Sequence, residues 1–283
     1  MSWHVLVQAY KSLQMVDAES ADFEPAWEVF SKQVLESSSC PPYHIRLLLR
    51  RLDDFREERP REDIAILDHG CGGALTLFYM AVLGYTNFWG LDVGGDLAIL
   101  NTIAAKKFGH EENRLSVYGG QKVPLPDESL DFVFSQQVIE HLNDQSLEPY
   151  YQEEGRILKQ GGLAVHYVPH RLVPYDSHTK TWLIHYLPQP LYRSLARLLG
   201  SPVPDHLHLR WPWVHRALIE RYVGSSEDVS VSRLSNMPEA ESYDGSVMIR
   251  RLISTVMNIP ILKVAAGFVL SDLVMLETIS VKS

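Results

Sequence analysis

Two segments of the sequence combine an apolar run, an acidic residue and glycines at a spacing that suits nucleotide binding. Ala65–Leu67 predicts a strand that ends in Asp68, and a turn rich in glycine follows at Gly70–Ala74. Glycine adopts backbone angles that other residues resist and lets the main chain approach a ligand closely. A second predicted strand, Phe88–Leu91, is followed by Asp92, where a carboxylate can bind both hydroxyls of a ribose. Together the segments predict a site for an adenosine-containing ligand.

Short apolar strands separated by helix-length segments must position these residues. Five strands are predicted after residue 60: Ile64–Asp68, Phe88–Asp92, Leu115–Tyr118, Asp131–Ser135 and Leu163–Val168. This alternation is typical of an α/β fold with a parallel sheet. Two further strands are expected at Val229–Leu234 and Leu273–Val281, with helical residues 246–270 between them.

The rest of the chain predicts a helical extension and an insertion. Within residues 1–60, Ala26–Leu35 and Tyr43–Phe55 have apolar residues at helical spacing, so we expect an N-terminal helical extension. The α/β domain is then expected over residues 61–283. Residues 169–222 are rich in His, Pro, Tyr and Trp, and we expect them to form a cap over the site.

Composition excludes several classes of protein. The chain has 283 residues, 46% of them hydrophobic and 22% charged, which is typical of a folded globular protein. Its net charge of −9 argues against nucleic acid as a partner. The two cysteines, Cys40 and Cys71, form neither a disulfide framework nor a thiolate metal site, which favours a reducing compartment.

The sequence also predicts a cytoplasmic protein without a transmembrane segment. Met1–Gln14 has none of the features of a secretory signal. The most apolar tract, Ile259–Ile279, contains Lys263, Asp272 and Glu277. Because charged residues are costly inside a bilayer, we expect this tract to be a core helix or a surface-associated helix.

Three further motifs identify a family that the chain resembles. Val123–Val133 has the sequence VPLPDESLDFV, Ser135–Leu142 has SQQVIEHL, and Arg156–Leu163 has RILKQGGL. With the glycine turn, they cover residues 64–168 in the order and spacing of class I S-adenosylmethionine-dependent methyltransferases, and the chain looks type 11-like. A nicotinamide oxidoreductase would fit the glycine turn but not these motifs. The resemblance implies a Rossmann-like seven-stranded sheet with an antiparallel last strand, and S-adenosylmethionine as the cofactor.

The resemblance also implies which residues bind the cofactor. Asp68 and the turn would bracket the methionine part, Asp92 would hold the ribose, Val93 would pack on the adenine, and Gln136 would face the methionine end. Where relatives have Gly-Asp-Ala, this chain has Tyr118-Gly119-Gly120, so Gln121 or backbone groups would replace the missing carboxylate. The expected set is Asp68, Gly70, Cys71, Gly72, Asp92, Val93, Gly120, Gln121 and Gln136.

Histidines supply the candidates for a catalytic base. Eight of the twelve lie between His141 and His215, and histidine is the usual base at neutral pH. His170, just after the fifth strand, is the first candidate and His141 the second, whereas His166 is expected to be an interior residue.

The acceptor pocket is expected to be formed by the cap and the N-terminal helices. The candidates are Gln137, Tyr175, His178 and Trp211, although Trp211 could equally pack the cap onto the sheet. His178 and His185, seven residues apart on a possible helix face, could bind a metal. Because no Asp or Glu at ligand spacing completes that set, we expect no metal site.

The expected function is methyl transfer to a small-molecule acceptor. Methylation of a hydroxyl, on a natural product, a sugar or a lipid-linked acceptor, is the first interpretation. N-methylation remains open, as does a non-catalytic protein that binds the cofactor as a scaffold.

Overall fold

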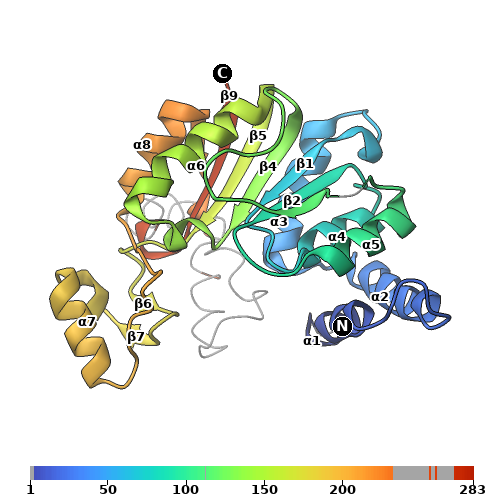
Figure 1. Ribbon diagram of the computed structural model, residues 1–283. Helices are drawn as coiled ribbons and strands as arrows, with labels where there is room; N and C mark the ends of the chain where they lie inside the picture. Colours follow the sequence, from blue (N-terminus) through green and yellow to red (C-terminus); the bar gives the residue numbers. More distant parts are fainter. Residues whose placement is uncertain (1–2, 112, 232–254, 256–258, 260–270) are drawn as a thin grey trace. The chain divides into compact units, whose positions relative to one another are not determined.

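The structure is a computed structural model that describes residues 3–111, 113–231, 255, 259 and 271–283 (Figure 1). Its helices are α1 (Trp3–Gln14), α2 (Phe23–Ser37), α3 (Tyr43–Arg56), α4 (Leu75–Val82), α5 (Ala98–Phe108), α6 (Asp144–Ile157), α7 (Gln189–Leu198) and α8 (Pro212–Tyr222). Its strands are β1 (Ile66–His69), β2 (Phe88–Asp92), β3 (Leu115–Val117), β4 (Leu130–Gln136), β5 (Leu158–Val168), β6 (Tyr175–Asp176), β7 (Thr181–Trp182), β8 (Gly224–Asp228) and β9 (Leu276–Lys282). Short 3₁₀ turns include η2 (Ile139–His141), η3 (Ile184–Tyr186) and η5 (Ser271–Leu273).

Seven strands form one mostly parallel sheet in the order β3-β2-β1-β4-β5-β9-β8. β1 pairs in parallel with both β2 and β4, while β8 and β9 pair in antiparallel fashion. The predicted α/β class and seven-stranded sheet are therefore confirmed. The parallel pairs bring the carboxyl ends of β1 and β2 to the same edge, because Asp68 lies opposite Gly90 and His69 opposite Leu91.

One strand lies elsewhere than the sequence predicted. β8 occupies Gly224–Asp228, whereas the apolar alternation predicted Val229–Leu234. Main-chain pairing with β9 defines β8, and its polar side chains give no alternating signal. Val229 is buried and donates its N–H to the carbonyl of Glu277 just after the strand ends. Residues 232–234 of the predicted strand, and residues 246–270 apart from 255 and 259, lie outside the described residues.

The chain divides into two compact units, and each is described by itself. The first includes the residues up to Phe134 together with Ile157–Leu163, and the second includes Ser135–Arg156 and most of the chain from Ala164 onward. Neither the boundary expected at residue 60 nor the cap expected over 169–222 is tested by this division, and both stay predictions. None of the described helices is both long and apolar enough to cross a membrane.

Aromatic packing holds the helices of the first unit against its strands. The rings of Phe78 on α4, Phe88 on β2 and Phe108 on α5 contact one another at centroid distances of 5.8–6.1 Å. Tyr10 on α1 joins this cluster, 5.7 Å from Phe78 and 5.2 Å from Phe30 on α2. The N-terminal helices thus bury their apolar stripes on the same core.

Tyr10 also binds the glycine turn, which we define as residues 70–74. Its hydroxyl donates a hydrogen bond of 2.7 Å to the carbonyl of Gly73. The phenol is only 3% exposed, so water competes little for that carbonyl. A side chain of the first helix therefore fixes the main chain of the turn.

A buried carboxylate joins three segments at the opposite ends of the strands. Asp131 Oδ2 accepts the N–H of Ala65, just before β1, at 2.9 Å. It also accepts from the ammonium of Lys159 on β5 at 2.9 Å, while Oδ1 accepts from the guanidinium of Arg59 at 3.0 Å. Burial alone would raise the pKa of Asp131, but the Ala65 N–H and the two cations lower it.

The second unit contains α6, α8 and a small hairpin beside α7. β6 and β7 pair in antiparallel fashion, and in Figure 1 they lie next to α7, in yellow. Inside this unit His166 Nε2 lies 2.7 Å from Glu154 Oε2, and both side chains are fully buried. The expectation that His166 is an interior residue is confirmed.

Replacing Asp131 with Asn should lower the free energy of unfolding by about 3 kcal/mol at neutral pH, because two cations lose a buried anionic partner. The pKa of Asp131 is lowered in the folded state. Its contribution is therefore present above the unfolded value of about 4 and is lost as pH falls below it. Urea denaturation at pH 7 and pH 3 measures both effects. Asp54→Asn, at an exposed carboxylate, is the control, and an equal difference from wild type at both pH values would contradict the assignment.

Tyr10→Phe should cost about 1 kcal/mol of stability and loosen the glycine turn, because the Gly73 carbonyl loses its donor. Hydrogen exchange of the amides in residues 70–76 should become faster in the native protein. Tyr79→Phe is the matched control, since it also loses one hydroxyl contact, to Ser37 Oγ at 3.0 Å. Equal exchange rates at the turn in both variants would show that Tyr10 does not hold it.

Candidate functional site

The glycine turn of the first unit is shaped by positive backbone angles and by bonds to β2. Gly70 and Gly72 have φ angles of 102° and 51°. The N–H groups of Gly70 and Cys71 both donate to the carbonyl of Leu91, at 2.7 and 3.0 Å. The turn is thereby fixed against the end of β2, as the sequence motif predicted.

Asp92 braces the turn from the end of β2. Its Oδ2 accepts the N–H of Gly72 at 2.8 Å, and its Oδ1 accepts the N–H of Gly94 at 3.2 Å. A Cβ atom added at Gly72 would meet no atom within 4 Å, so open space lies beside Gly72. This is the cradle in which a ligand can approach the main chain.

A second acid lies near Asp92 in this region. Asp68, at the end of β1, is 5% exposed. Burial, and then the charge of Asp92, raise the pKa of Asp68 well above its usual range. Burial and the same two acids also raise the pKa of the Cys71 thiol, so Cys71 is a neutral, buried wall residue. A cationic ligand group would favour the ionised form of Asp68 beside the charged Asp92.

Two residues expected at the adenine lie side by side. Val93, just after β2, is 65% exposed although it is apolar. A Cβ added at Gly120 would lie 3.3 Å from Cγ1 of Val93. Gln121, which follows Gly120, is exposed. The exposed Val93 side chain is the kind of surface on which a flat ring packs.

The first unit therefore fits an adenosine cofactor with a positive charge. Asp92 offers a carboxylate to ribose hydroxyls, and Gly72 leaves room for the chain of the ligand. Asp68 is an acid that a cationic group would help to ionise. The roles of the individual residues stay predictions. Gln136 and Gln137, also expected near the ligands, lie in the second unit; Gln137 has a φ of 56° and donates its N–H to the Tyr167 carbonyl at 3.0 Å.

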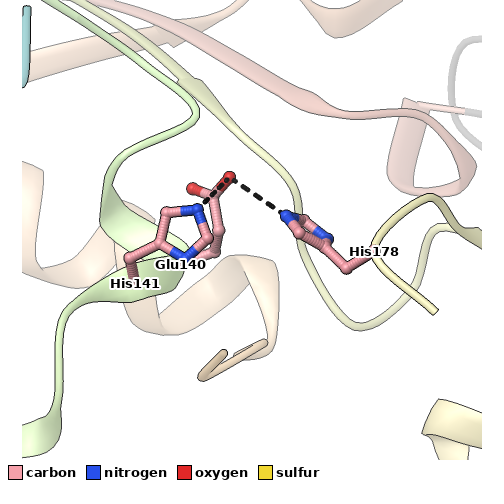
Figure 2. Close-up of side chains that lie close together, drawn as sticks. All are labelled: Glu140, His141 and His178. Carbon is pink, nitrogen blue, oxygen red and sulfur yellow. Dashed lines mark ion pairs between the residues drawn. The ribbon is translucent and has the colours of Figure 1, made fainter. Parts of the chain in front are cut away.

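The second unit brings together three side chains from distant parts of the chain. Glu140 and His141 lie on η2, and His178 lies in the turn between β6 and β7 (Figure 2). Oε1 of Glu140 is 3.9 Å from Nε2 of His141 and 3.9 Å from Nε2 of His178. We call Glu140, His141 and His178 the Glu140 cluster.

The charges of the Glu140 cluster are poorly balanced by hydrogen bonds. The Glu140 side chain is 0% exposed, and neither carboxylate oxygen has a hydrogen-bond partner among the described residues. Burial raises the pKa of Glu140 to about 7. Burial lowers the pKa of His141, and the nearby His178 adds to that effect.

His178 is held by a carboxylate of its own. Its Nδ1 and its main-chain N–H both contact Asp176 Oδ1, at 3.1 and 3.0 Å, and this hydrogen bonding raises the pKa of His178. Burial alone would raise the pKa of Asp176, but bonds from His178, Thr179 and Tyr192 hold it well below its usual range. The bond at Nδ1 leaves Nε2 of His178 facing Glu140.

The first candidate for a catalytic base, His170, is a buried structural residue. Its Nε2 lies 2.7 Å from the Val274 carbonyl, and its Nδ1 accepts the N–H of Leu172 at 3.2 Å. Burial lowers its pKa to about 4, and the residue is 1% exposed. With both ring nitrogens bound to the main chain, neither is available to an acceptor.

Other expected acceptor residues pack within the second unit. The ring of Tyr175 contacts Trp182 across the hairpin at 5.1 Å. Trp211 stacks on Trp213 at 5.1 Å, and the guanidinium of Arg171 lies 5.1 Å from its ring centroid. These contacts agree with the alternative in which Trp211 packs the structure.

The alternative in which His178 and His185 share a helix face, which the sequence did not favour, does not occur. His185 lies on η3, is buried, and its Nε2 contacts the carbonyl of Val173 at 2.8 Å. Sequence reasoning also missed Glu140 and Asp176. Their signals were an acid and a histidine adjacent at 140–141 and an Asp-x-His at 176–178, but only the fold brings the two pairs together.

Comparison with known proteins agrees with this geometry. A family model described as a methyltransferase domain matches residues 67–166. A ubiquinone biosynthesis O-methyltransferase from Chelativorans sp. (strain BNC1) is 33% identical over 209 residues, which cover 67% of this chain and 78% of that protein. A protein of the same name from Pelagibacter ubique is 28% identical over 131 residues, which cover 43% of this chain and 50% of that protein.

The matched proteins differ in how much of their length this chain covers. The chain spans about half the length of the Pelagibacter protein, and 43% of that of a similarly named protein from Mesorhizobium japonicum. Among solved structures, the YcgJ protein from Bacillus subtilis matches with 15% identity and a TM-score of 0.47, over 85% of this chain and 98% of that one. A score below 0.5 adds no support of its own. The Chelativorans match is long and similar enough to decide, and this chain belongs to the S-adenosylmethionine-dependent methyltransferases.

Proposed function

We propose that this protein transfers a methyl group from S-adenosylmethionine to an oxygen of a small-molecule acceptor. Three similar proteins are named as ubiquinone biosynthesis O-methyltransferases, which favours a hydroxyl acceptor. A hydroxyl on a natural product, a sugar or a lipid-linked molecule fits this class.

The observation that supports the proposal most is the brace between Asp92 and Gly72. One carboxylate holds the turn through a 2.8 Å bond, and the space beside Gly72 is open. The same carboxylate can accept hydrogen bonds from the two ribose hydroxyls, because each oxygen accepts more than one donor. Val93 and Gly120 would then flank the adenine, with Gln121 close by, while Asp68, Gly70 and Cys71 would line the methionine part.

When bound, S-adenosylmethionine supplies a methyl group on a positively charged sulfur. The acceptor oxygen gains this methyl group and loses its proton, and the sulfur is left as the neutral thioether of S-adenosylhomocysteine. The protein must therefore lower the cost of that proton loss and align the oxygen. A positively charged cofactor would favour the ionised form of Asp68, so the site would bind the charged cofactor better than the neutral product.

Among the histidines of the second unit, His141 and His178 are better candidates than His170 for contact with an acceptor. Both nitrogens of His170 are engaged with the main chain. His141 and His178 keep 36% and 20% of their side chains exposed, so a small molecule can contact them. Gln137, which is also exposed, lies three residues before Glu140 in the chain and would bind the acceptor through its amide.

Incubation with S-adenosylmethionine labelled in the methyl group, and with phenols, catechols and amines, tests the function. We expect label in a phenol or catechol. Asp92→Asn should weaken S-adenosylhomocysteine binding roughly 10- to 100-fold by calorimetry, because a charged acceptor is worth about 1.5–3 kcal/mol.

Asp96→Asn is the matched control for this variant. Asp96 is exposed, and its Oδ1 accepts the N–H of Ala98 at 3.0 Å without contacting the glycine turn. Equal affinities for Asp92→Asn and wild type would remove Asp92 from the site. Label in amines alone would replace O-methylation by N-methylation, and binding without any transfer would favour the scaffold interpretation.

His170→Ala should act on stability and leave cofactor binding unchanged. Removing the imidazole leaves the buried carbonyl of Val274 and the partly buried N–H of Leu172 without this partner and opens a cavity, at a cost of about 3 kcal/mol. Urea denaturation measures the loss, and His206→Ala, at an exposed histidine, should change stability by no more than about 0.5 kcal/mol. A His170→Ala protein of normal stability that loses its methyl-transfer rate would restore His170 as the base.

A further inference from the structure

The Glu140 cluster has the composition and arrangement of a metal site. It is a feature separate from the glycine turn. Each of its three residues offers one ligand atom, and these atoms all lie within 4.8 Å of one another. Figure 2 shows the carboxylate of Glu140 between the two imidazoles. We propose that Glu140, His141 and His178 bind a divalent transition-metal cation.

The buried carboxylate is the strongest argument for a cation. The Glu140 side chain is fully buried and neither oxygen accepts a hydrogen bond among the described residues. Burying a carboxylate without partners is unfavourable, and proteins normally compensate for it with a cation or with hydrogen-bond donors. The two imidazoles at 3.9 Å are too far away to donate hydrogen bonds to it. A metal ion between the three groups would supply the missing charge.

A metal ion would fit between the three ligand atoms if the imidazoles moved closer to Glu140. Metal bonds of about 2.1 Å in a tetrahedral site place ligand atoms about 3.4 Å apart. Glu140 Oε1 is 3.9 Å from each imidazole Nε2, about 0.5 Å more than that. The ligand atoms of the two histidines lie within 4.8 Å of each other, so this pair would approach by up to about 1.4 Å. His141 and His178 are partly exposed and His178 lies in a hairpin turn, so their rings can move inward while Glu140 stays fixed.

His178 also has the outer partner that metal-binding histidines usually have. Asp176 Oδ1 contacts its Nδ1 at 3.1 Å, which directs Nε2 toward Glu140. Asp176 is in turn fixed by hydroxyl donors from Thr179 and Tyr192, both at 2.6 Å. A carboxylate behind a histidine ligand sets its orientation and increases its basicity.

The ligand types select the class of metal. Two imidazoles and one carboxylate suit zinc, iron or another divalent transition metal, whereas magnesium and calcium prefer oxygen ligands. Three protein ligands leave at least one coordination position open, as in catalytic zinc sites. Under the proposed function, an acceptor hydroxyl bound there would lose its proton more easily. That role rests on the proposed function, whereas metal binding does not.

Calorimetry with Zn²⁺ alone, added to the metal-free full chain, tests the proposal. We expect one tightly bound ion per chain. Glu140→Gln and His178→Ala should each weaken binding more than about 100-fold, and Asp176→Asn should weaken it about 10- to 100-fold through the orientation of His178. Glu140→Gln is expected to fold, because the amide replaces a carboxylate that has no hydrogen-bond partner among the described residues.

His206→Ala is the matched control. His206 is exposed, and its ring lies 5.1 Å from that of His141, but it is not a member of the cluster. It should keep wild-type affinity. Thermal melting confirms that each variant is folded, and Zn²⁺ should raise the melting temperature of wild type but not of Glu140→Gln. The proposal is overturned if Glu140→Gln binds Zn²⁺ as tightly as wild type, or if His206→Ala loses binding to the same extent as His178→Ala. S-adenosylhomocysteine titrations of the same proteins report separately on the proposed function.

Discussion

The carboxylate of Asp131 fixes the start of the central strands, and the candidate cofactor site depends on it. Its bond to the Ala65 N–H sets where β1 begins beside β4, and Lys159 extends the same contact to β5. In a parallel sheet this register determines which residues stand opposite each other further along, and Asp68 lies opposite Phe134. The position of the glycine turn relative to β4 is therefore determined several residues earlier, at the other end of β1.

Buried carboxylates in this protein fall into two groups. Asp131 and Asp176 accept several hydrogen bonds from N–H, hydroxyl or charged groups, and their pKa values are lowered. Asp68 and Glu140 are also buried, and burial raises their pKa values. Perturbed acids of the second kind are typical of binding and catalytic sites. The two acids with raised pKa values are the ones that we assign to ligands, one in each unit.

The sequence allowed the glycine turn to be predicted because all of its determinants are local. β1, the turn and β2 lie within residues 65–92, and each strand is marked by buried apolar residues. β8 was misplaced because its side chains are polar and its pairing with β9 is made by the main chain. His170 was correctly expected after β5. Its imidazole is buried against the Val274 carbonyl, a partner more than a hundred residues away that the local sequence does not indicate. The Glu140 cluster likewise requires a hairpin that places His178 beside η2.

The bond between Tyr10 and Gly73 has a consequence for how the chain acquires its binding surface during synthesis. The donor is made first and the acceptor 63 residues later, so α1 leaves the ribosome before its partner exists. Domains usually begin to fold as soon as enough chain has emerged. Here the hydrogen bond to Gly73 can form only once the earliest helix has docked onto residues made after it. A shortened protein that starts at residue 61 would keep every residue of the glycine turn and still lack the phenol that holds it.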